Sequence, residues 1–308
     1  MANADHAASP RSLSSPGAPT PSASSPAAEA SLENAARPAP HESRLAAAFG
    51  KGRPALITYL MAGYPDRATS LEALHAAARA GADVVELGVP YGDPLADGPV
   101  IAEAAKVARG QEGGFGLAEA IVLAAEFAGG RVDEPASAAG GDALPPVVLM
   151  TYLNPLMRYG LARAADEMRN VGVAGVIVPD MPPESARPWL AVSGGIDTVF
   201  LVAPTSTDER LAVVAAASSG FLYCVSSTGI TGERAELSAD LAVLVSRVRA
   251  HSDLPVAIGF GISTPGQAAE VARIADGVIV GSAIVKRQRD PDEVEAFVRS
   301  LHVAMDGS

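Results

Sequence analysis

The chain has 308 residues, of which 48% are hydrophobic and 19% charged, so it can bury a full core and could hold one barrel of about 250 residues. The 30 glycines and 24 prolines are too many for a helical bundle, and one cysteine excludes a disulfide scaffold and any cysteine-based zinc or iron–sulfur site. A formal net charge of −12 disfavours nucleic acid and anionic membranes as partners. No apolar run reaches the roughly 18 residues of a membrane span, and no secretory signal is present, so we expect a cytoplasmic protein.

The first 41 residues differ in composition from the rest. Ala, Ser and Pro fill 27 of the first 40 positions. Such a segment cannot bury enough apolar surface to offset its ordering entropy, so we predict a disordered tail over residues 1–41. The alternative is a plastid transit peptide, which should be rich in Ser and poor in acidic residues. The segment has two arginines against three acidic residues, which favours the plain tail.

Beyond the tail, a short helix is expected at 42–49, and short apolar runs then alternate with helical stretches. The runs are continuously apolar, which is typical of strands buried on both faces of a parallel sheet. They lie at residues 55–60, 83–88, 147–152, 174–179, 197–202, 221–226, 256–260 and 276–281. Eight such units predict an α/β fold with a closed (β/α)₈ TIM barrel over residues 42–304, followed by a short tail at 305–308. A doubly wound open sheet is the alternative, although no GxGxxG follows the first strand.

Two connections are longer than the others, at residues 89–99 after the second strand and 226–238 after the sixth. Both run from a strand to a helix, and in a barrel such loops form the catalytic rim. A third long segment, 129–146, runs from a helix to a strand. We therefore expect it on the opposite rim, as a polar surface insertion with no role in chemistry.

Side chains at the carboxyl ends of the strands carry the chemistry of a barrel, and here the candidates are acidic. All five histidines and all three lysines lie away from the predicted strand ends, which disfavours a Schiff-base lysine, a histidine base and a histidine-ligated metal. The carboxylates left are Glu86 in the second strand, Asp93 and Asp97 in the next loop, and Asp180 after the fourth strand.

Glu86 is the most informative of these because its strand is otherwise apolar. A buried carboxylate is costly unless it is paired or used, and burial raises its pKa toward the range of a general acid or base. The alternative is a structural glutamate in a salt bridge. Asp97 precedes Gly98 and Pro99 and could instead cap a helix. Asp93 and Asp180 precede or adjoin prolines and could simply form turns.

Glycine-rich turns follow the last three strands. Their sequences are STGITG (227–232), GFGIS (259–263) and GSAIV (281–285). Backbone N–H groups in such turns, with a helix N-terminus, bind phosphate without a cationic side chain. Loops after strands seven and eight are the usual phosphate position in barrels, so we expect a phosphate site there, tight turns alone being the alternative.

The segment ELGVPYGDPLADGPVI (86–101), with the three glycine turns in the same order, resembles the tryptophan synthase alpha subunit family over about residues 42–304. The resemblance implies a (β/α)₈ barrel and retro-aldol cleavage of indole-3-glycerol phosphate to indole and glyceraldehyde 3-phosphate. It also implies a beta subunit as partner, in an alpha2-beta2 heterotetramer, that receives the indole and carries pyridoxal phosphate. This chain would then need no cofactor and no metal.

The resemblance also implies residue roles. Glu86 and Asp97 match the catalytic pair, with Glu86 protonating indole C3 and Asp97 accepting from the indole N–H. Glu86 can then act as base toward the glycerol hydroxyl, and which of the two carboxylates does so stays open. The phosphate-binding positions match Gly232, Gly261 and Gly281, with Ser282 beside them. Tyr223 matches a tyrosine near the substrate, and the positions around the indole ring match Tyr59, Leu60, Met150 and Phe260. For these four, ordinary packing in the barrel core is the alternative.

The sequence departs from the family pattern at two places. Gly63-Tyr64-Pro65 stands where many members have Gly-Asp-Pro, and Ser227 stands where some carry an arginine. The second departure puts an arginine clamp of the loop in doubt but leaves the chemistry intact. Three other functions stay open: a stand-alone lyase of the same fold, a non-catalytic subunit that binds the phosphate ligand and regulates a partner, and an unrelated phosphosugar isomerase.

Overall fold

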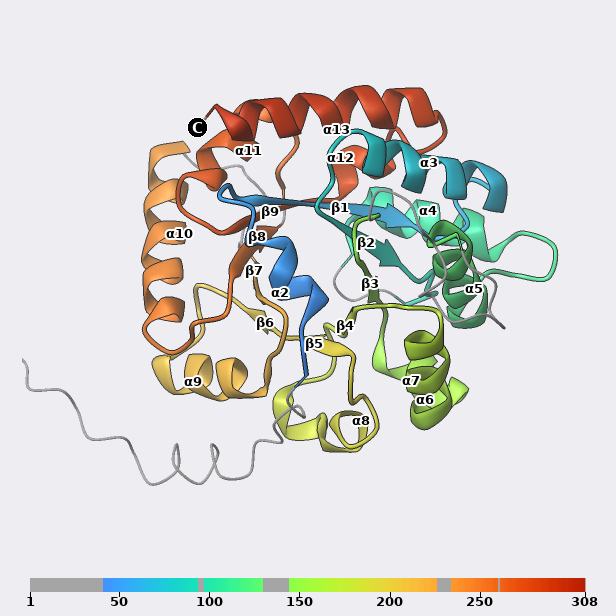
Figure 1. The fold of residues 1–308 in the computed structure, drawn as a ribbon, viewed down its shortest axis with the longest axis horizontal. Coiled ribbons are helices and arrows are strands. Elements are labelled where there is room, and N and C mark those ends of the chain that lie inside the picture. Colours follow the sequence, from blue (N-terminus) through green and yellow to red (C-terminus); the bar gives the residue numbers. More distant parts are fainter. Residues whose placement is uncertain (1–40, 94–96, 130–143, 226–233, 260, 308) are drawn as a thin grey trace, which may run out of the picture.

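The computed structural model of the chain describes residues 41–93, 97–129, 144–225, 234–259 and 261–307. The strands are β1 (Ala55–Met61), β2 (Val84–Gly88), β3 (Val147–Met150), β4 (Gly175–Ile177), β5 (Asp197–Val199), β6 (Leu201–Val202), β7 (Leu222–Val225), β8 (Val256–Gly259) and β9 (Gly277–Val280). All neighbours pair in parallel, in the order β5-β4-β3-β2-β1-β9-β8-β7-β6. β5 and β6 are two parts of one predicted run, interrupted only at Phe200, so the two ends of this order meet and the sheet closes into the predicted barrel (Figure 1).

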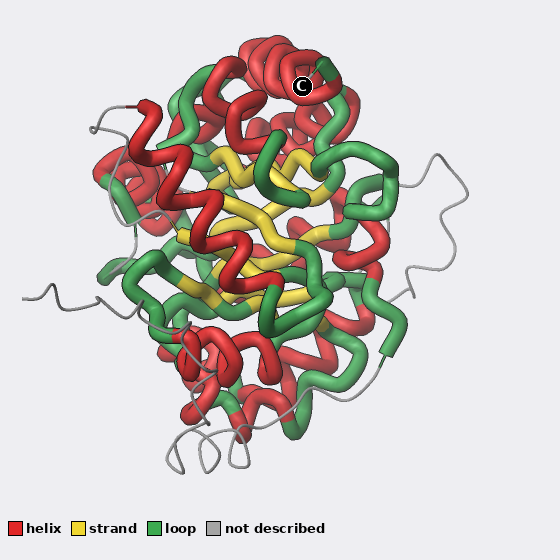
Figure 2. The backbone as a smooth tube through the Cα atoms, turned by 90° about the vertical axis from the view of Figure 1, so that its left-hand side faces the viewer, coloured by secondary structure: helices red, strands yellow, loops and turns green. Residues whose placement is uncertain are grey.

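Apart from the first, which lies across the amino end of the barrel, the helices surround the strands on the outside (Figures 1 and 2). They are α2 (Arg44–Ala48), α3 (Arg67–Arg79), α4 (Pro99–Arg109), α5 (Leu117–Phe127), α6 (Leu153–Tyr159), α7 (Leu161–Asn170), the 3-10 turn η2 (Pro183–Ser185), α8 (Arg187–Leu190), α9 (Asp208–Ala217), α10 (Arg234–Arg249), α11 (Pro265–Ala272), α12 (Ser282–Val285) and α13 (Pro291–Asp306). Within the described ranges, no helix is both long enough and apolar enough to cross a bilayer.

The barrel extends beyond its predicted carboxyl-terminal boundary. The last helix runs to Asp306, and Met305 is 2% exposed, so the barrel continues past the predicted boundary at 304 and residues 305 and 306 belong to α13. Residues 1–40 and most of the 129–146 segment lie outside the described residues.

Successive side chains along each strand point alternately into the barrel interior and toward the layer under the helices. On β1, Ile57 packs with the interior cluster and Leu56 with the larger cluster beneath the helices. On β2, Val84 and Val85 divide in the same way. Because side chains alternate with a period of two, Glu86 points into the interior like Val84.

Helix α2 closes the amino end of the barrel, and Figure 1 shows it across the strands. Leu45 and Ala48 are buried in the interior cluster with residues from the starts of the strands. The Ser43 hydroxyl accepts from the N–H of Ala46 at the helix start and donates to the buried carboxylate of Asp197, with an O–O distance of 2.6 Å. A side chain at Gly175 would overlap Leu45, so glycine there lets the helix seat closely.

The loop after β1 is held by one buried amide. Gln288 donates to the carbonyls of Met61 and Tyr64, at 2.7 and 2.9 Å, and accepts from the N–H of Met61. Gly63 has a φ of +73°, and a side chain there would overlap Phe115. The Gly63-Tyr64-Pro65 segment is therefore held by hydrogen bonds to its backbone, and the Tyr64 hydroxyl also accepts from Arg289 at 2.9 Å.

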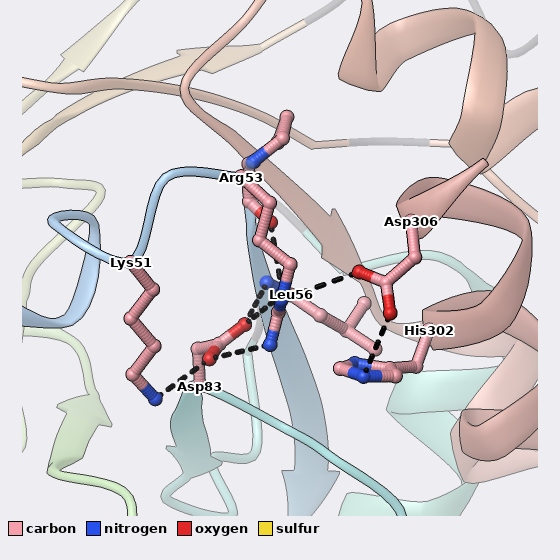
Figure 3. A network of polar contacts seen from close by, with 7 residues as sticks. Lys51, Arg53, Leu56, Asp83, His302 and Asp306 are labelled. Carbon is pink, nitrogen blue, oxygen red and sulfur yellow. Dashed lines mark hydrogen bonds and ion pairs between the residues drawn. The ribbon is translucent and has the colours of Figure 1, made fainter. Parts of the chain in front are cut away.

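A buried carboxylate at the amino side of β2 binds the segment before β1, which in turn contacts α13 (Figure 3). Asp83 is 2% exposed, accepts from the backbone N–H of Leu56 at 2.9 Å and pairs with Lys51 and Arg53 at 2.8 Å. Arg53 also reaches Asp306 on α13, at 3.3 Å. The pairing satisfies both oxygens of Asp83, so its charge is compensated in spite of burial.

We predict that Asp83→Ala destabilises the barrel by about 3 kcal/mol, because it leaves the half-buried guanidinium of Arg53 and the buried N–H of Leu56 without their acceptor. Urea unfolding measures the loss. The matched control is Asp166→Ala, which removes an exposed carboxylate paired with Arg169 at 2.8 Å and should cost under about 1 kcal/mol. Equal losses in the two variants would contradict the role given to Asp83.

Candidate active site

A cavity of about 350 Å³ opens at the carboxyl ends of the strands. It is bounded by strand-end and loop residues from β1, β2, β3, β7, β8 and β9 and by the start of α12. The lining residues are Tyr59, Glu86, Asp97, Gly98, Ile101, Met150, Tyr223, Gly261, Ile262, Ser263, Ile279, Gly281, Ser282, Ala283, Lys286 and Arg287. The structure thus brings together both predicted catalytic carboxylates and most of the predicted binding residues.

Glu86 lies in the wall of this cavity and is 1% exposed. Its Oε2 has no hydrogen-bond partner among the described residues. Burial, and second the nearby charge of Asp97, raise the pKa of Glu86 from 4.5 to about 8. The salt-bridged structural glutamate is wrong for the described residues, since no cation pairs with this carboxyl.

Asp97 lines the same cavity from the residue before Gly98, at the entrance to α4, and is half-buried. Burial raises its pKa from 3.8 to about 6, and a hydrogen bond from the Tyr152 hydroxyl opposes that rise. The helix-cap interpretation is wrong, because the N-cap of α4 is Gly98 and no side chain caps the helix. The Asp97 carboxylate is therefore free of the helix and available to the cavity.

Two tyrosines reach into the cavity from strands on either side. Tyr59 pairs in register with Glu86, and Tyr223 enters from β7. Burial is the first cause that raises the pKa of both phenols, so they stay protonated. A side chain at Gly88 would overlap the Tyr59 hydroxyl, and one at Gly259 would overlap that of Tyr223. These two glycines therefore make room for the phenol rings.

The predicted binding residues divide into three groups. Gly261, Gly281, Ser282, Tyr59, Met150 and Tyr223 line the cavity. Leu60 does not, because it packs in the cluster beneath the helices, and its assignment to the ring pocket is corrected here. Gly232 and Phe260 lie outside the described residues. Leu60 fails for a simple reason: successive residues of a strand face opposite sides, so Tyr59 and Leu60 cannot both face inward.

The other two acidic candidates serve elsewhere. Asp180 is exposed and accepts from the backbone N–H of Leu153 at 2.8 Å, at the start of α6, which confirms a local structural role. Asp93 is exposed and lines a second cavity, beside α6, rather than the one that holds Glu86.

Sequence reasoning missed two residues at this site. Tyr152, the hydrogen-bond donor to Asp97, follows β3 by two residues, and its place directly after a strand was the available signal. Lys286 was set aside because it lies off the strand ends, yet it lines the cavity from the end of α12. Among the described residues, no cluster of three or more His, Cys, Asp or Glu side chains could hold a metal ion.

The arrangement is suited to proton transfer. At neutral pH the pKa of about 8 keeps Glu86 protonated, while the pKa of about 6 leaves Asp97 mostly ionised. Two carboxyl groups whose environments push their pKa values apart form an acid and an anion in one site. The cavity can therefore donate a proton from one carboxyl group and stabilise positive charge with the other.

Comparisons with known proteins agree with one another. A family model described as tryptophan synthase alpha chain matches residues 45–306. A tryptophan synthase alpha chain from Streptomyces coelicolor is 47% identical over 262 residues, covering 83% of this chain and 92% of the relative. One from Chloroflexus aurantiacus is 42% identical over 271 residues, covering 84% and 97%.

Solved structures match over a similar range. A Mycobacterium tuberculosis tryptophan synthase superposes with a TM-score of 0.74 at 39% identity, covering 86% of this chain and 99% of that chain. A tryptophan synthase subunit alpha from Legionella pneumophila gives a TM-score of 0.74 at 31% identity, covering 87% and 100%.

The raised pKa of Glu86 predicts a pH-dependent stability cost. The folded protein keeps this proton up to about pH 8, whereas the unfolded chain loses it near pH 4.5, so folding stability falls between those values as the pH rises. Glu86→Gln cannot ionise, so the wild type should lose up to about 1.4 kcal/mol per pH unit relative to this variant. Denaturant unfolding at pH 5, 7 and 8.5 measures the difference.

The control is Glu103→Gln, at an exposed glutamate of α4. Its stability should follow the wild type at all three pH values. A Glu86→Gln curve parallel to the wild type across this range would show that Glu86 is ionised in the folded protein.

Proposed function

The chain belongs to the tryptophan synthase alpha chain family, whose members are lyases that cleave indole-3-glycerol phosphate to indole and glyceraldehyde 3-phosphate, and we propose that Glu86 and Asp97 carry out that cleavage here. The observation that carries the proposal is the buried Glu86 carboxyl, which faces the cavity and whose Oε2 has no hydrogen-bond partner among the described residues. A protein retains such a costly group where it is used.

In the proposed reaction, Glu86 donates its proton to indole C3. The ring becomes an indolenine cation with its charge at nitrogen, and Asp97 stabilises that charge by accepting from the N–H. The glycerol hydroxyl then loses its proton to the Glu86 carboxylate, a carbonyl forms, and the bond from C3 to the glycerol carbon breaks. The bond electrons return to the ring, giving indole and the aldehyde, and Glu86 is protonated again.

Binding would divide between two parts of the cavity. We propose that Gly261, Gly281 and Ser282 hold the phosphate, with Gly232 contributing from outside the described residues. Gly281 and Ser282 lead into α12, whose first N–H groups have no acceptor within the helix. Tyr59, Met150 and Tyr223 offer the apolar surface that would receive the indole ring, together with Phe260.

No resident cofactor or metal is proposed for this chain, because the two carboxyl groups supply the acid, the base and the charge stabilisation that the cleavage requires. Pyridoxal phosphate would belong to a beta chain in an alpha2-beta2 heterotetramer, located in the cytoplasm. The matched Mycobacterium tuberculosis proteins are described as tryptophan synthase, which supports a beta partner.

A face beside the active site suits that partner. Met157 on α6 is 64% exposed, which is unusual for a large apolar side chain. Next to it, a cavity of about 650 Å³ is lined from α6 by Asn154 and Arg158, and by Tyr91 and Gly92 from the loop after β2. Both features lie at the carboxyl ends of the strands, so an indole released from the first cavity would have a short path to a chain docked there.

Cleavage of indole-3-glycerol phosphate, followed as indole release, tests the proposed acid. Glu86→Gln should fold and lose about 10²- to 10⁴-fold in turnover, because the amide cannot donate the proton. Glu103→Gln should keep wild-type turnover. Glu86→Gln turnover above about a tenth of wild type would remove Glu86 from the proton transfer.

Asp97→Asn should lose turnover, by at least about tenfold, while substrate binding stays within a few-fold of wild type. An amide cannot balance the positive charge on the ring nitrogen, but it fills the same space. Because Gly98 rather than Asp97 caps α4, the thermal midpoint should hardly change. A variant that melts well below wild type yet cleaves normally would show a structural role instead.

Met157→Asp should weaken binding of a tryptophan synthase beta chain by tenfold or more, because it places a charge in an apolar contact. Cleavage by the isolated variant should match the wild type. Val303→Asp is the control, at an equally exposed residue of α13 (65% exposed) on another side of the barrel. Sedimentation or titration calorimetry with the beta chain measures both, and equal affinity of the two variants would place the partner elsewhere.

A further inference from the structure

The charge balance of the catalytic cavity is unfavourable for its substrate. At neutral pH its wall holds the mostly ionised carboxylate of Asp97 beside the protonated Glu86, and the site would have to admit a phosphate group with a charge near −2. The whole chain adds to the repulsion, with a formal net charge of −12. Backbone N–H groups supply only partial charges, so a positively charged side chain in the wall would matter for binding.

Among the described lining residues, the cations are Lys286 and Arg287. Arg287 is already engaged: its Nη1 donates to the Ala283 carbonyl at 2.6 Å, and its guanidinium lies 4.0 Å from the centre of the Phe297 ring. These contacts with Ala283 and with Phe297 of α13 keep the Arg287 guanidinium packed on the protein. Among the described lining residues, Lys286 is therefore the cation whose side chain can reach a ligand.

Lys286 has the geometry for that contact. It ends α12, and its backbone N–H donates to the Ser282 carbonyl at 3.1 Å, which closes one helical turn. Residues four apart lie on the same helical face, so Lys286 rises beside Ser282 on the wall proposed for the phosphate. Its side chain is exposed, and within the described ranges no carboxylate lies within 4.0 Å of its Nζ.

We propose that Lys286 is a binding residue for the substrate phosphate, and that its ammonium group supplies the full positive charge that the glycine turns lack. This rests on the proposed function, because it assumes that the phosphate of indole-3-glycerol phosphate lies at Gly281 and Ser282. Lys286 takes no part in the proton transfers. Its exposure also separates it from Schiff-base lysines, which are activated by desolvation or by a neighbouring cation.

The test compares Lys286→Met, Lys286→Arg and Lys106→Met. Lys106 is an exposed lysine of α4 outside the cavity, so its variant changes net charge equally without altering the site. Titration calorimetry with glycerol 3-phosphate and with indole gives Kd values, and indole-3-glycerol phosphate cleavage gives kcat and KM.

For Lys286→Met we expect glycerol 3-phosphate to bind about tenfold more weakly, with KM raised by a similar factor. Indole binding and kcat should stay within twofold of wild type, Lys286→Arg should recover most of the loss, and Lys106→Met should behave as wild type. A Lys286→Met protein that binds glycerol 3-phosphate like Lys106→Met would overturn the proposal. So would an equal loss of indole binding, which would indicate a distorted cavity.

The two proposals can fail separately. Wild-type protein that binds glycerol 3-phosphate through Lys286, but does not cleave indole-3-glycerol phosphate, would leave this inference standing and reject the proposed catalytic roles. If the wild-type protein cleaves the substrate and KM is unchanged in Lys286→Met, the proposed catalytic roles stand and this inference is rejected.

Discussion

Closure of the parallel sheet is the constraint on which the site depends. Once β5 and β6 join the two ends of the strand order, each strand has one face toward the interior and one toward the helices. Alternation then sends Glu86 inward together with Tyr59, its partner in register. Burial on this inner face, and second the nearby charge of Asp97, raise the pKa of Glu86 to about 8, so it holds a proton at neutral pH.

Two buried carboxyl groups, one just before β2 and one in its middle, have opposite surroundings. Asp83, just before the strand, has two cations and a backbone N–H, and it ties the amino-terminal segment toward α13. Glu86, three residues later, has no partner on Oε2 among the described residues. The compensated charge of Asp83 stabilises the barrel, whereas the unpaired carboxyl of Glu86 costs stability and is the group proposed to transfer the proton. This separation follows the usual division of a (β/α)₈ barrel into a stability face and a catalytic face.

The two carboxyl groups of the cavity differ in pKa because their surroundings differ. Asp97 keeps a lower pKa than Glu86 because it is less buried and accepts a hydrogen bond from Tyr152. Glycines at 88 and 259 admit the Tyr59 and Tyr223 rings, which narrow the apolar part of the cavity. Lys286 lines the cavity from the end of α12. Different elements around one cavity thus supply the protonated carboxyl, the carboxylate, the apolar surface and the ammonium group.

The sequence by itself determined the eight-unit alternation, the strand positions to within a few residues, and Glu86 as a charge in an apolar strand, because each of these is a local pattern. It also placed Glu86 and Asp97 together, since both follow or belong to one strand. Tertiary structure alone decided that Leu60 faces the helices while Tyr59 faces the cavity, that Gly98 rather than Asp97 caps α4, and that Lys286 lines the wall. These outcomes depend on which side of each element meets its neighbours, and residue spacing along one element carries no record of the neighbours that barrel closure brings against it.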